Sequence, residues 1–470
     1  METRELRQIL ERQRCRAMVV ARAPLTERRE RLRSLRRAVV SHKDAIFKAL
    51  YEDLRRPAFE SEIAEFQHVI QEIDVALRQL PRWMRPRRTG GPLLLAGTSS
   101  RLIAEPKGTV LILAPWNYPF ALILNPLVAA LAAGNCAVVK PSEHAPATAE
   151  LLSRLLGESF PPEEVTTVLG GPDTAAALVD LPFDHIFFTG SSDVGRKVMA
   201  AAARHLTSVT LELGGKTPAI VDSSADVRGA ARAIVWAKYF NAGQTCLAPD
   251  YVLVHDSVHD QFVDAVADTV ARFYGDSADA RRSSGDFGRI VDDGHWARLV
   301  ELVDDAVNGG AIVVCGGDGE AESRYFAPTV LTDVQPTMRV MQEEIFGPVL
   351  PVVRFTDRAD GLGHARVNGR PLGSYIFARD RRAAERWLRD VLAGGSVLNN
   401  TLLHYANPLL PFGGIGTSGM GAYHGYHGFL TMSHLRPVVV QRRPTLSRLL
   451  HPPYRGRVHG LVRRILPWLR

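Results

Sequence analysis

From residue 108 onward, short apolar runs alternate with amphipathic helical patterns, and this alternation limits the fold more than any other feature of the sequence. Runs such as GTVLILAP (108–115) and DHIFFTG (184–190) are rich in apolar or β-branched residues and end in turn formers. Helical patterns such as TAELLSRLLGESF (148–160) separate these runs. Strands that are apolar on both faces and separated by helices are typical of parallel sheets with helices on each side. The sequence therefore predicts an α/β fold.

A second alternating region runs from about Pro218 to Leu398, and the glycine-rich segment LELGGK (211–216) lies between the two regions. A chain of 470 residues is too long for one ordinary hydrophobic core. Residues 1–85 add helical patterns, and the proline- and glycine-containing stretch RWMRPRRTGGPL (82–93) indicates an excursion or linker. We expect two α/β domains with a cleft between them.

The net charge of +7 is concentrated near the C-terminus. The 80 residues after Asp390 contain nine arginines and no acidic residue, which leaves 48 basic and 50 acidic residues in the rest of the chain. An excess confined to one end is typical of a tail, so we expect no nucleic acid as a partner. The N-terminus lacks the apolar run of a signal peptide, and the four cysteines lack CxxC or metal-type spacing. We therefore expect a cytoplasmic protein with reduced thiols and no metal site.

Cys246 lies in the turn NAGQTCLAP (241–249), between a helical stretch and the strand-like run DYVLVH (250–255). An isolated cysteine is usually a small buried apolar residue, and this is our interpretation of Cys15, Cys136 and Cys315. A turn rich in glycine, glutamine and threonine suits a catalytic thiol, because backbone amides there can support the thiolate. Cys246 is therefore a candidate nucleophile.

Two further motifs offer polar groups for proton transfer and oxyanion binding. Glu212 ends the apolar strand of LELGGK, where a carboxylate either acts as a general base in a cleft or pairs with a lysine such as Lys216. Asn117 in APWNYPF (114–120) is placed either to donate its amide N–H to a developing oxyanion or to satisfy turn backbone. These residues alone leave both alternatives open.

Three motifs are suited to binding a dinucleotide. The GSSDVG turn at 190–195 joins a strand to a helix and could cradle a phosphate, although its GxxxxG spacing differs from the GxGxxG fingerprint. The motif VVKPSE places Lys140 and Glu143 at the carboxyl end of a strand, where ribose groups bind in open α/β sheets. The segment QEEIFGPVLPV (342–352) offers acids to a sugar hydroxyl and an apolar wall in Phe346. Each motif also has a structural interpretation: the turn at 190–195 as an ordinary strand-to-helix turn, Lys140 and Glu143 as a surface ion pair, and the segment 342–352 as a solvated strand.

Taken together and in this order, the motifs PWNYPF, KPSE, FTGSSDVG, LELGGK, GQTC and EEIFGP resemble the aldehyde dehydrogenase superfamily. The resemblance extends from about residue 20 to about residue 440. The segments NAGQTCLAPDYVL and LPFGGIGTSGMGAYHGYHGF are similar to the class-3 branch, which includes fatty, aromatic and coniferyl aldehyde dehydrogenases. The resemblance implies that Cys246 is the nucleophile, Glu212 the general base and Asn117 the oxyanion donor.

The same resemblance implies a nicotinamide cofactor, NAD or NADP. The implied cofactor contacts are Gly190, Ser191 and Gly195 at the pyrophosphate, Lys140 and Glu143 at the adenosine ribose, Glu344 at the nicotinamide ribose, and Trp116, Leu213 and Phe346 elsewhere. Glu143 favours NAD, because a carboxylate bonds a ribose 2′-hydroxyl and repels a 2′-phosphate, while class-3 members often accept both cofactors. The implied pocket for a hydrophobic aldehyde, aliphatic of medium or long chain or aromatic, includes Tyr118, Leu122 and His404.

The resemblance also divides the chain. It implies two Rossmann-like parallel-sheet domains, one for the cofactor (1–211, with an oligomerisation excursion near 86–104) and one for catalysis (212–398). Residues 399–441 would return to the first domain as the oligomerisation arm of a homodimer. The basic tail (442–470) contains VHGLVRRILPWL, which is typical of an amphipathic helix. We expect this helix either to lie on the inner face of an anionic membrane or to pack on its own dimer.

The expected reaction is oxidation of an aldehyde to its carboxylic acid through a cysteine thiohemiacetal and thioester. A cysteine hydrolase or acyltransferase is one alternative, but it would leave the phosphate-type turn unexplained. A non-catalytic binding protein on the same fold is the other, but it would not need to keep Cys246, Glu212 and Asn117 together.

Overall fold

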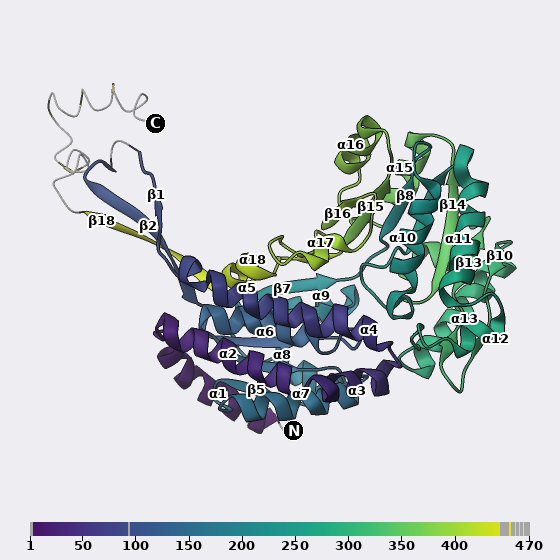
Figure 1. The fold of residues 1–470 in the computed structure, drawn as a ribbon. Helices are drawn as coiled ribbons and strands as arrows, with labels where there is room; N and C mark the ends of the chain where they lie inside the picture. Colours follow the sequence, from purple (N-terminus) through teal and green to yellow (C-terminus); the bar gives the residue numbers. More distant parts are fainter. Residues whose placement is uncertain are drawn as a thin grey trace.

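The computed structural model describes residues 3–92 and 95–441, with His451, Pro452, Gly456, Gly460 and Arg464 beyond them. Within these residues the strands form two large sheets, a smaller three-stranded arm and the two-stranded sheet of β11 (Gly319–Glu320) and β12 (Tyr325–Phe326); the two large sheets and the arm are labelled in Figure 1. The predicted α/β fold with two mainly parallel sheets is confirmed by this strand topology.

The first sheet has the order β17-β7-β6-β3-β4-β5. Its strands are β3 (Thr109–Leu113), β4 (Cys136–Lys140), β5 (Val165–Thr167), β6 (His185–Gly190), β7 (Ser208–Leu213) and β17 (Gly419–Met420). Strands β3 to β7 pair in parallel, whereas the late strand β17 pairs antiparallel to β7 and sets Gly419 opposite Glu212. The apolar runs that predicted these strands are buried, as expected for a sheet covered on both faces.

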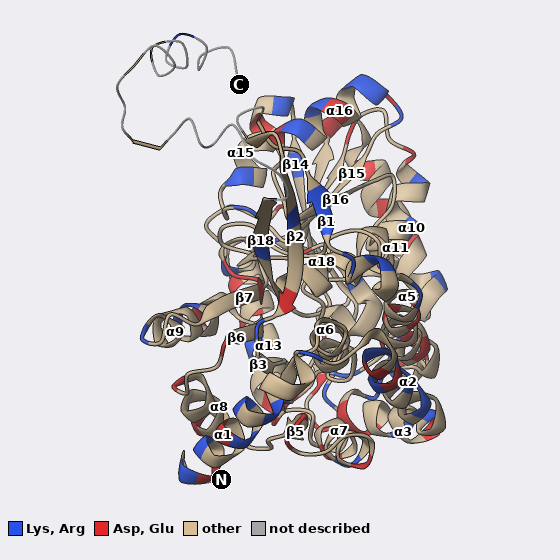
Figure 2. Cartoon of the chain, turned by 90° about the vertical axis from the view of Figure 1, so that its left-hand side faces the viewer, with Lys and Arg blue, Asp and Glu red and all other residues tan. Residues whose placement is uncertain are grey.

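Helices cover both faces of this sheet (Figure 1). They are α1 (Thr3–Val20), α2 (Leu25–Ser41), α3 (Lys43–Leu54), α4 (Ala58–Ser61), α5 (Gln67–Trp83), α6 (Ala121–Ala133), α7 (Pro146–Ser159), α8 (Pro172–Val179) and α9 (Ser192–Ala203), with a π-helical turn η1 (Glu62–Phe66) between α4 and α5. All 13 residues of α6 are buried, which explains why its sequence ALILNPLVAALAA is apolar on every side. Acidic and basic residues are intermixed along the outer helices (Figure 2).

The second sheet has the order β10-β13-β14-β9-β8-β15-β16. Its strands are β8 (Pro218–Val221), β9 (Tyr251–His255), β10 (Ile312–Cys315), β13 (Thr329–Thr332), β14 (Val349–Phe355), β15 (Gly373–Phe377) and β16 (Gly395–Leu398). Its helices are α10 (Val227–Tyr239), α11 (His259–Tyr274), α12 (Ala278–Ser283), α13 (Asp293–Asn308), α14 (Arg339–Gln342), α15 (Arg358–Arg366) and α16 (Arg381–Asp390). The edge strand β10 pairs antiparallel to β13, unlike the remaining strands, which pair in parallel.

Strand β7 continues to Leu213, so Glu212 belongs to the last long strand of the first sheet. The chain therefore passes to the second sheet between Leu213 and Pro218, within the glycine-rich segment that was expected to be the joint. The division into domains at 211 and 212 stays a prediction.

The arm consists of β1 (Arg87–Thr89), β2 (Thr98–Pro106) and β18 (Ser433–Gln441), and it projects away from both sheets (Figure 1). Strand β18 pairs antiparallel with β2 over nine residues on each strand. The arm thus joins the excursion expected near 86–104 to the end of the return segment. No helix among the described residues is long and apolar enough to cross a membrane. The amphipathic helix expected in the tail lies outside the described residues.

Candidate active site

A pocket of about 440 Å³ brings together Asn117, Glu212 and Cys246. Asn117 lies in the loop between β3 and α6, Glu212 lies on β7, and Cys246 follows α10. The pocket walls also include residues of the second sheet's layer, among them Trp236 and Glu344. The three residues expected to do chemistry therefore meet, although they are far apart in the sequence.

The turn that carries Cys246 has an unusual backbone. Asn241 and Ala242 have φ values of 53° and 52°, in the left-handed region that residues other than glycine rarely occupy. Gly243 has φ 77°, and a Cβ atom there would lie 2.2 Å from the carbonyl oxygen of Gly347. This glycine is therefore required so that the cysteine turn can pack against the EEIFGP segment.

The side chain of Gln244 ties this turn to its surroundings. Its Nε2 donates to the carbonyl oxygens of Asn241 at 3.0 Å and Arg289 at 2.9 Å. Its Oε1 accepts a hydrogen bond from the backbone N–H of Val291 at 2.9 Å. The conformation of the turn is thus fixed by one buried amide whose role could not be assigned from the sequence.

The thiol of Cys246 is protonated at neutral pH in this structure. Burial raises its pKa to about 12, the negative charges of Glu344 and Glu212 add to the rise, and the backbone N–H groups of Cys246 and Leu247 oppose it. Nucleophilic attack therefore needs a base that removes the thiol proton or a nearby positive charge that favours the thiolate.

Glu212 has the properties of such a base. It is only 3% exposed, and neither carboxylate oxygen forms a hydrogen bond of normal geometry among the described residues, although the backbone N–H of Gly414 is close enough to oppose the rise of its pKa. Burial raises its pKa well above the usual range of a carboxyl group. The alternative ion pair with Lys216 does not form, because Lys216 instead pairs with Asp250 and donates to the carbonyl oxygens of Val340 and Glu343.

Asn117 is held in an orientation that leaves donor capacity free. Its side-chain Nδ2 donates to the backbone carbonyl oxygen of Gln244 at 3.1 Å. The backbone carbonyl oxygen of Asn117 accepts hydrogen bonds from Arg56 and Asn241. An amide nitrogen carries two N–H groups, so one remains for a ligand. Asn117 is only 2% exposed and lines the pocket.

The side of the pocket expected to hold the cofactor is built from close backbone contacts. Gly190, Ser191 and Leu213 line it, and Ser191 caps helix α9 by accepting a hydrogen bond from the N–H of Val194 at 3.4 Å. Gly195 is placed differently, since a Cβ there would lie 2.7 Å from the side chain of Leu213. Gly195 therefore allows the helix to pack closely on β7 and is not among the residues that line the pocket.

Glu344, Phe346 and Trp116 line the same side. A Cβ on Gly214 would lie 2.2 Å from a carboxylate oxygen of Glu344, which explains a glycine at this position. Burial and the charge of Asp250 raise the pKa of Glu344 to about 7. The rings of Trp116 and Phe346 meet edge to face at 5.4 Å.

Two of the residues expected at the adenosine ribose pair with each other. Nζ of Lys140 lies 2.8 Å from a carboxylate oxygen of Glu143, and Lys140 is buried. Neither residue is among those that line the pocket. Among the described residues, no group of three or more His, Cys, Asp and Glu side chains is placed to hold a metal ion.

The opposite side of the pocket is apolar and aromatic. Tyr118 and Leu122 line it, as expected, together with Ile63, Trp236, Phe240, Leu247, Leu372, Leu402, Tyr405, Phe412 and Tyr423. His404 is not among the lining residues; its ring packs against Tyr375 and Phe412, and burial lowers its pKa to about 4. Most of these aromatic residues were missed, because isolated aromatic residues in the sequence carry no sign of where they point.

Comparisons with known proteins agree on the family of this chain. The model of the aldehyde dehydrogenase family matches residues 3–438. The chain is 41% identical over 430 residues to the 4,4′-diaponeurosporen-aldehyde dehydrogenase of Staphylococcus aureus, covering 92% of each protein. It is 42% identical over 433 residues to aldehyde dehydrogenase family 3 member B1 of Rattus norvegicus, covering 92% of this chain and 91% of the relative.

Among solved structures, the substrate-bound state of Staphylococcus aureus AldH superposes with a TM-score of 0.93 at 38% identity and covers 99% of each chain. Both the sequence and the fold therefore agree over nearly the whole length with enzymes that oxidise aldehydes, in accordance with the class-3 resemblance of the motifs. On these grounds, this chain belongs to the aldehyde dehydrogenase family and is an oxidoreductase.

Proposed function

We propose that this enzyme oxidises a hydrophobic aldehyde to its carboxylic acid with NAD or NADP, through a thioester on Cys246. The observation that carries the proposal is the meeting of a thiol, a free amide donor and an unpartnered carboxylate in one pocket with an apolar wall. Each group fits one step of the reaction, and the wall fits a substrate without charge.

The first step is attack by the Cys246 sulfur on the aldehyde carbon, with the thiol proton passing to Glu212. A new C–S bond forms, and the carbonyl π electrons move to oxygen. The resulting oxyanion is stabilised by the free N–H of Asn117 and by the backbone N–H of Cys246. Because both groups are already fixed by their neighbours, they need little reorganisation in the transition state.

The second step is loss of the hydride from the tetrahedral carbon, which leaves the acyl group on sulfur as a thioester. The nicotinamide of the bound cofactor supplies the hydride acceptor. Glu212 releases the thiol proton to solvent and then removes a proton from a water molecule, which attacks the thioester carbon; the C–S bond breaks, and the carboxylic acid and the Cys246 thiolate are released. Burial raises the pKa of Glu212, and a higher pKa makes its carboxylate a stronger proton acceptor in both transfers.

The fit of a dinucleotide rests on the pocket's backbone-lined side. Gly190 and Gly214 keep the chain free of side chains that would block a phosphate or ribose. The start of α9 offers backbone N–H groups to a pyrophosphate, and Glu344 offers a carboxylate to a ribose hydroxyl. Lys140 and Glu143 would hold the second ribose, and Glu143 favours NAD over NADP.

The substrate class follows from the aromatic wall around Tyr118, Leu122 and Phe412. Two bacterial relatives are named as dehydrogenases of 4,4′-diaponeurosporen-aldehyde and of 4,4′-diapolycopene-4,4′-dial. We infer that this enzyme also takes an apolar aldehyde, aliphatic of medium or long chain or aromatic. A homodimer built through the arm of β1, β2 and β18 is part of the same proposal.

The test is formation of reduced cofactor from hexanal, dodecanal, benzaldehyde and coniferaldehyde, with NAD and with NADP, in wild type and Cys246→Ala. Turnover that disappears in the variant supports the reaction, and the ranking of aldehydes identifies the substrate class. A folded wild-type protein that reduces neither cofactor with any of these aldehydes would contradict the proposal.

A further inference from the structure

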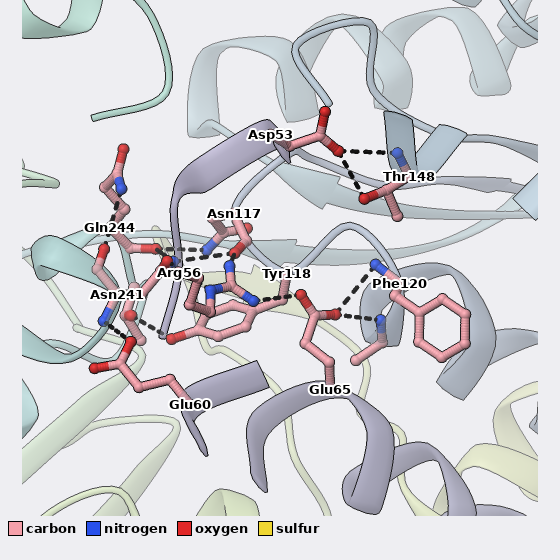
Figure 3. A network of polar contacts seen from close by, with 12 residues as sticks. Asp53, Arg56, Glu60, Glu65, Asn117, Tyr118, Phe120, Thr148, Asn241 and Gln244 are labelled. Carbon is pink, nitrogen blue, oxygen red and sulfur yellow. Dashed lines mark hydrogen bonds and ion pairs between the residues drawn. The ribbon is translucent and has the colours of Figure 1, made fainter. Parts of the chain in front are cut away.

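Arg56 is a buried cation that lies outside the pocket and contacts both sides of the catalytic centre (Figure 3). Its Nε donates to Oδ1 of Asn241 at 2.9 Å, next to the cysteine turn. Its Nη1 pairs with Oε1 of Glu65 at 2.5 Å, and its Nη2 donates to the carbonyl oxygen of Asn117. One planar guanidinium therefore joins three segments that are far apart in the sequence.

The ion pair between Arg56 and Glu65 holds the backbone of Asn117 from both directions. Arg56 bonds the Asn117 carbonyl, while Oε2 of Glu65 accepts hydrogen bonds from the N–H groups of Phe120 at 3.1 Å and Ala121 at 2.7 Å. Both side chains of the pair are fully buried. The short loop that presents the oxyanion donor is thus fixed at Asn117 and again at the start of α6.

The same arginine fixes the distance between the oxyanion donor and the nucleophile turn. Nδ2 of Asn241 donates to the carbonyl oxygens of both Asn117 (3.0 Å) and Gln244 (3.1 Å). Nδ2 of Asn117 donates to that same Gln244 carbonyl at 3.1 Å, two residues before Cys246. The contacts form a closed ring, and Arg56 binds it through Asn117 and Asn241.

Asn241 needs such support because its backbone is in the left-handed region. Glu60, also buried, accepts the backbone N–H of Asn241 at 2.9 Å, so the segment 56–65 supplies three charged side chains to this site. The three residues lie on no pocket wall. Arg56, Glu60 and Glu65 therefore contact the loop of Asn117 and the turn that carries Cys246, and they do not contact a bound ligand.

We propose that Arg56 is a positioning residue of the aldehyde oxidation, acting through Asn117 to keep the oxyanion donor in place relative to Cys246. This inference rests on the proposed function. Arg56 touches neither the aldehyde nor the cofactor site, so its loss changes the rate of the chemical steps and not the affinity for either ligand. Displacement of a catalytic group by about 1 Å can lower a rate by roughly a hundredfold.

The first test is Arg56→Met, which keeps the unbranched apolar stem of the side chain but removes all three contacts. We expect kcat to fall by roughly 10- to 100-fold, with KM for aldehyde and for NAD within about threefold of wild type. Arg56→Lys retains the positive charge beside Glu65 but lacks the planar guanidinium group that makes several hydrogen bonds at once. Its kcat should therefore lie between those of wild type and Arg56→Met. Equal loss in both variants, or a loss seen only in KM, would contradict the proposal.

The matched control is Arg31→Met. Arg31 is largely buried, with 11% of its side chain exposed; it pairs with Glu164 at 2.9 Å and donates to the carbonyl oxygen of Asn135 at 3.0 Å, but it does not line the pocket. Its loss should lower the midpoint of urea unfolding while leaving kcat within about twofold of wild type. If Arg31→Met lowers kcat as much as Arg56→Met does, the effect is one of general stability and the proposal is wrong.

The decisive test is a double-mutant cycle with Asn117→Ala. If Arg56 acts through Asn117, adding Arg56→Met to Asn117→Ala produces a much smaller fold-loss in kcat than Arg56→Met produces in wild type. Equal fold-losses in the two backgrounds overturn this inference alone. Absence of aldehyde turnover in wild type would overturn the proposed function and this inference with it.

Discussion

Two regions of the molecule bury glutamate side chains to a similar extent and surround them in opposite ways. Glu65, beside the catalytic loops, pairs with Arg56 and accepts two backbone N–H groups (Figure 3). Glu212, inside the pocket, forms no hydrogen bond of normal geometry among the described residues. A fully bonded buried carboxylate fixes structure, whereas an unbonded one is free to exchange protons. Hydrogen bonding of the buried carboxylate therefore distinguishes Glu65, which holds the catalytic loops in place, from Glu212, which takes part in proton transfer.

The largest effect is expected when the reactive carboxylate is removed. Glu212→Gln has nearly the same volume but cannot accept a proton, so kcat should fall by roughly 10²- to 10⁴-fold. Its unfolding midpoint in urea should not fall below that of wild type, because no hydrogen bond is lost. Steady-state turnover and urea denaturation measure the two quantities. A variant that is as active as wild type would show that another group is the base.

The opposite outcome is expected at Glu65. Glu65→Met leaves Arg56 buried without its partner and should lower the free energy of unfolding by about 3–5 kcal/mol. Glu62 provides the control, because it is on the same turn but forms a partly exposed pair with Lys43 at 2.7 Å. Glu62→Gln should cost less than about 1 kcal/mol. Urea unfolding measures the loss of unfolding free energy in both variants. Equal losses in Glu65→Met and Glu62→Gln would contradict the role given to the buried ion pair.

The raised pKa of Glu212 also predicts how stability depends on pH. A carboxyl group whose pKa is higher in the folded state holds its proton more tightly there, so the folded state loses stability as pH rises from the unfolded pKa towards the folded one. Glutamine does not titrate, so the stability advantage of Glu212→Gln over wild type should increase as pH rises above the ordinary pKa range of a carboxyl group. Urea midpoints of both proteins at increasing pH measure it. If the stability advantage of Glu212→Gln over wild type decreases as pH rises, the pKa of Glu212 is lowered in the folded state and not raised.

The smallest effect is expected at Asp53, a third bonded acid of the same region. Its carboxylate accepts a hydrogen bond from the N–H of Thr148 (2.9 Å) at the start of α7 (Figure 3). It also accepts one from the N–H of Ala147 (3.0 Å). Asp53→Ala should cost about 1–2 kcal/mol of stability, as loss of a helix cap does. The value of kcat should stay unchanged, since Asp53 has no contact with Asn117 or Cys246. A tenfold fall in kcat would show that this acid also belongs to the catalytic support.

Much of this molecule could be predicted from local pattern. The runs DHIFFTG and DYVLVH form the expected strands β6 and β9, because a buried parallel strand needs a continuous apolar run. The motifs that contain Asn117, Glu212 and Cys246 indicated three residues that meet in the pocket. Each of these signals is contained in fewer than about ten consecutive residues, the length of a strand and its turn.

What could not be predicted depends on contacts between distant residues. The antiparallel addition of β17 beside Glu212 joins segments about two hundred residues apart, and no local pattern encodes such a pairing. Arg56 is one of 57 basic residues and sits in an ordinary charged stretch. Its contacts to Asn117 and Asn241 are 61 and 185 residues away, so only the folded chain identifies it.

The most direct test of the account is the mass of Glu212→Gln after reaction with dodecanal and NAD. We expect acylation to be slowed by loss of the base for the thiol, and to yield at most one equivalent of reduced cofactor and a protein whose mass has increased by one acyl group, located on the peptide that contains Cys246. The thioester accumulates because the base that activates water is absent. A variant that forms reduced cofactor but carries no acyl group, or carries it on another residue, would contradict the assignment of Cys246 and Glu212.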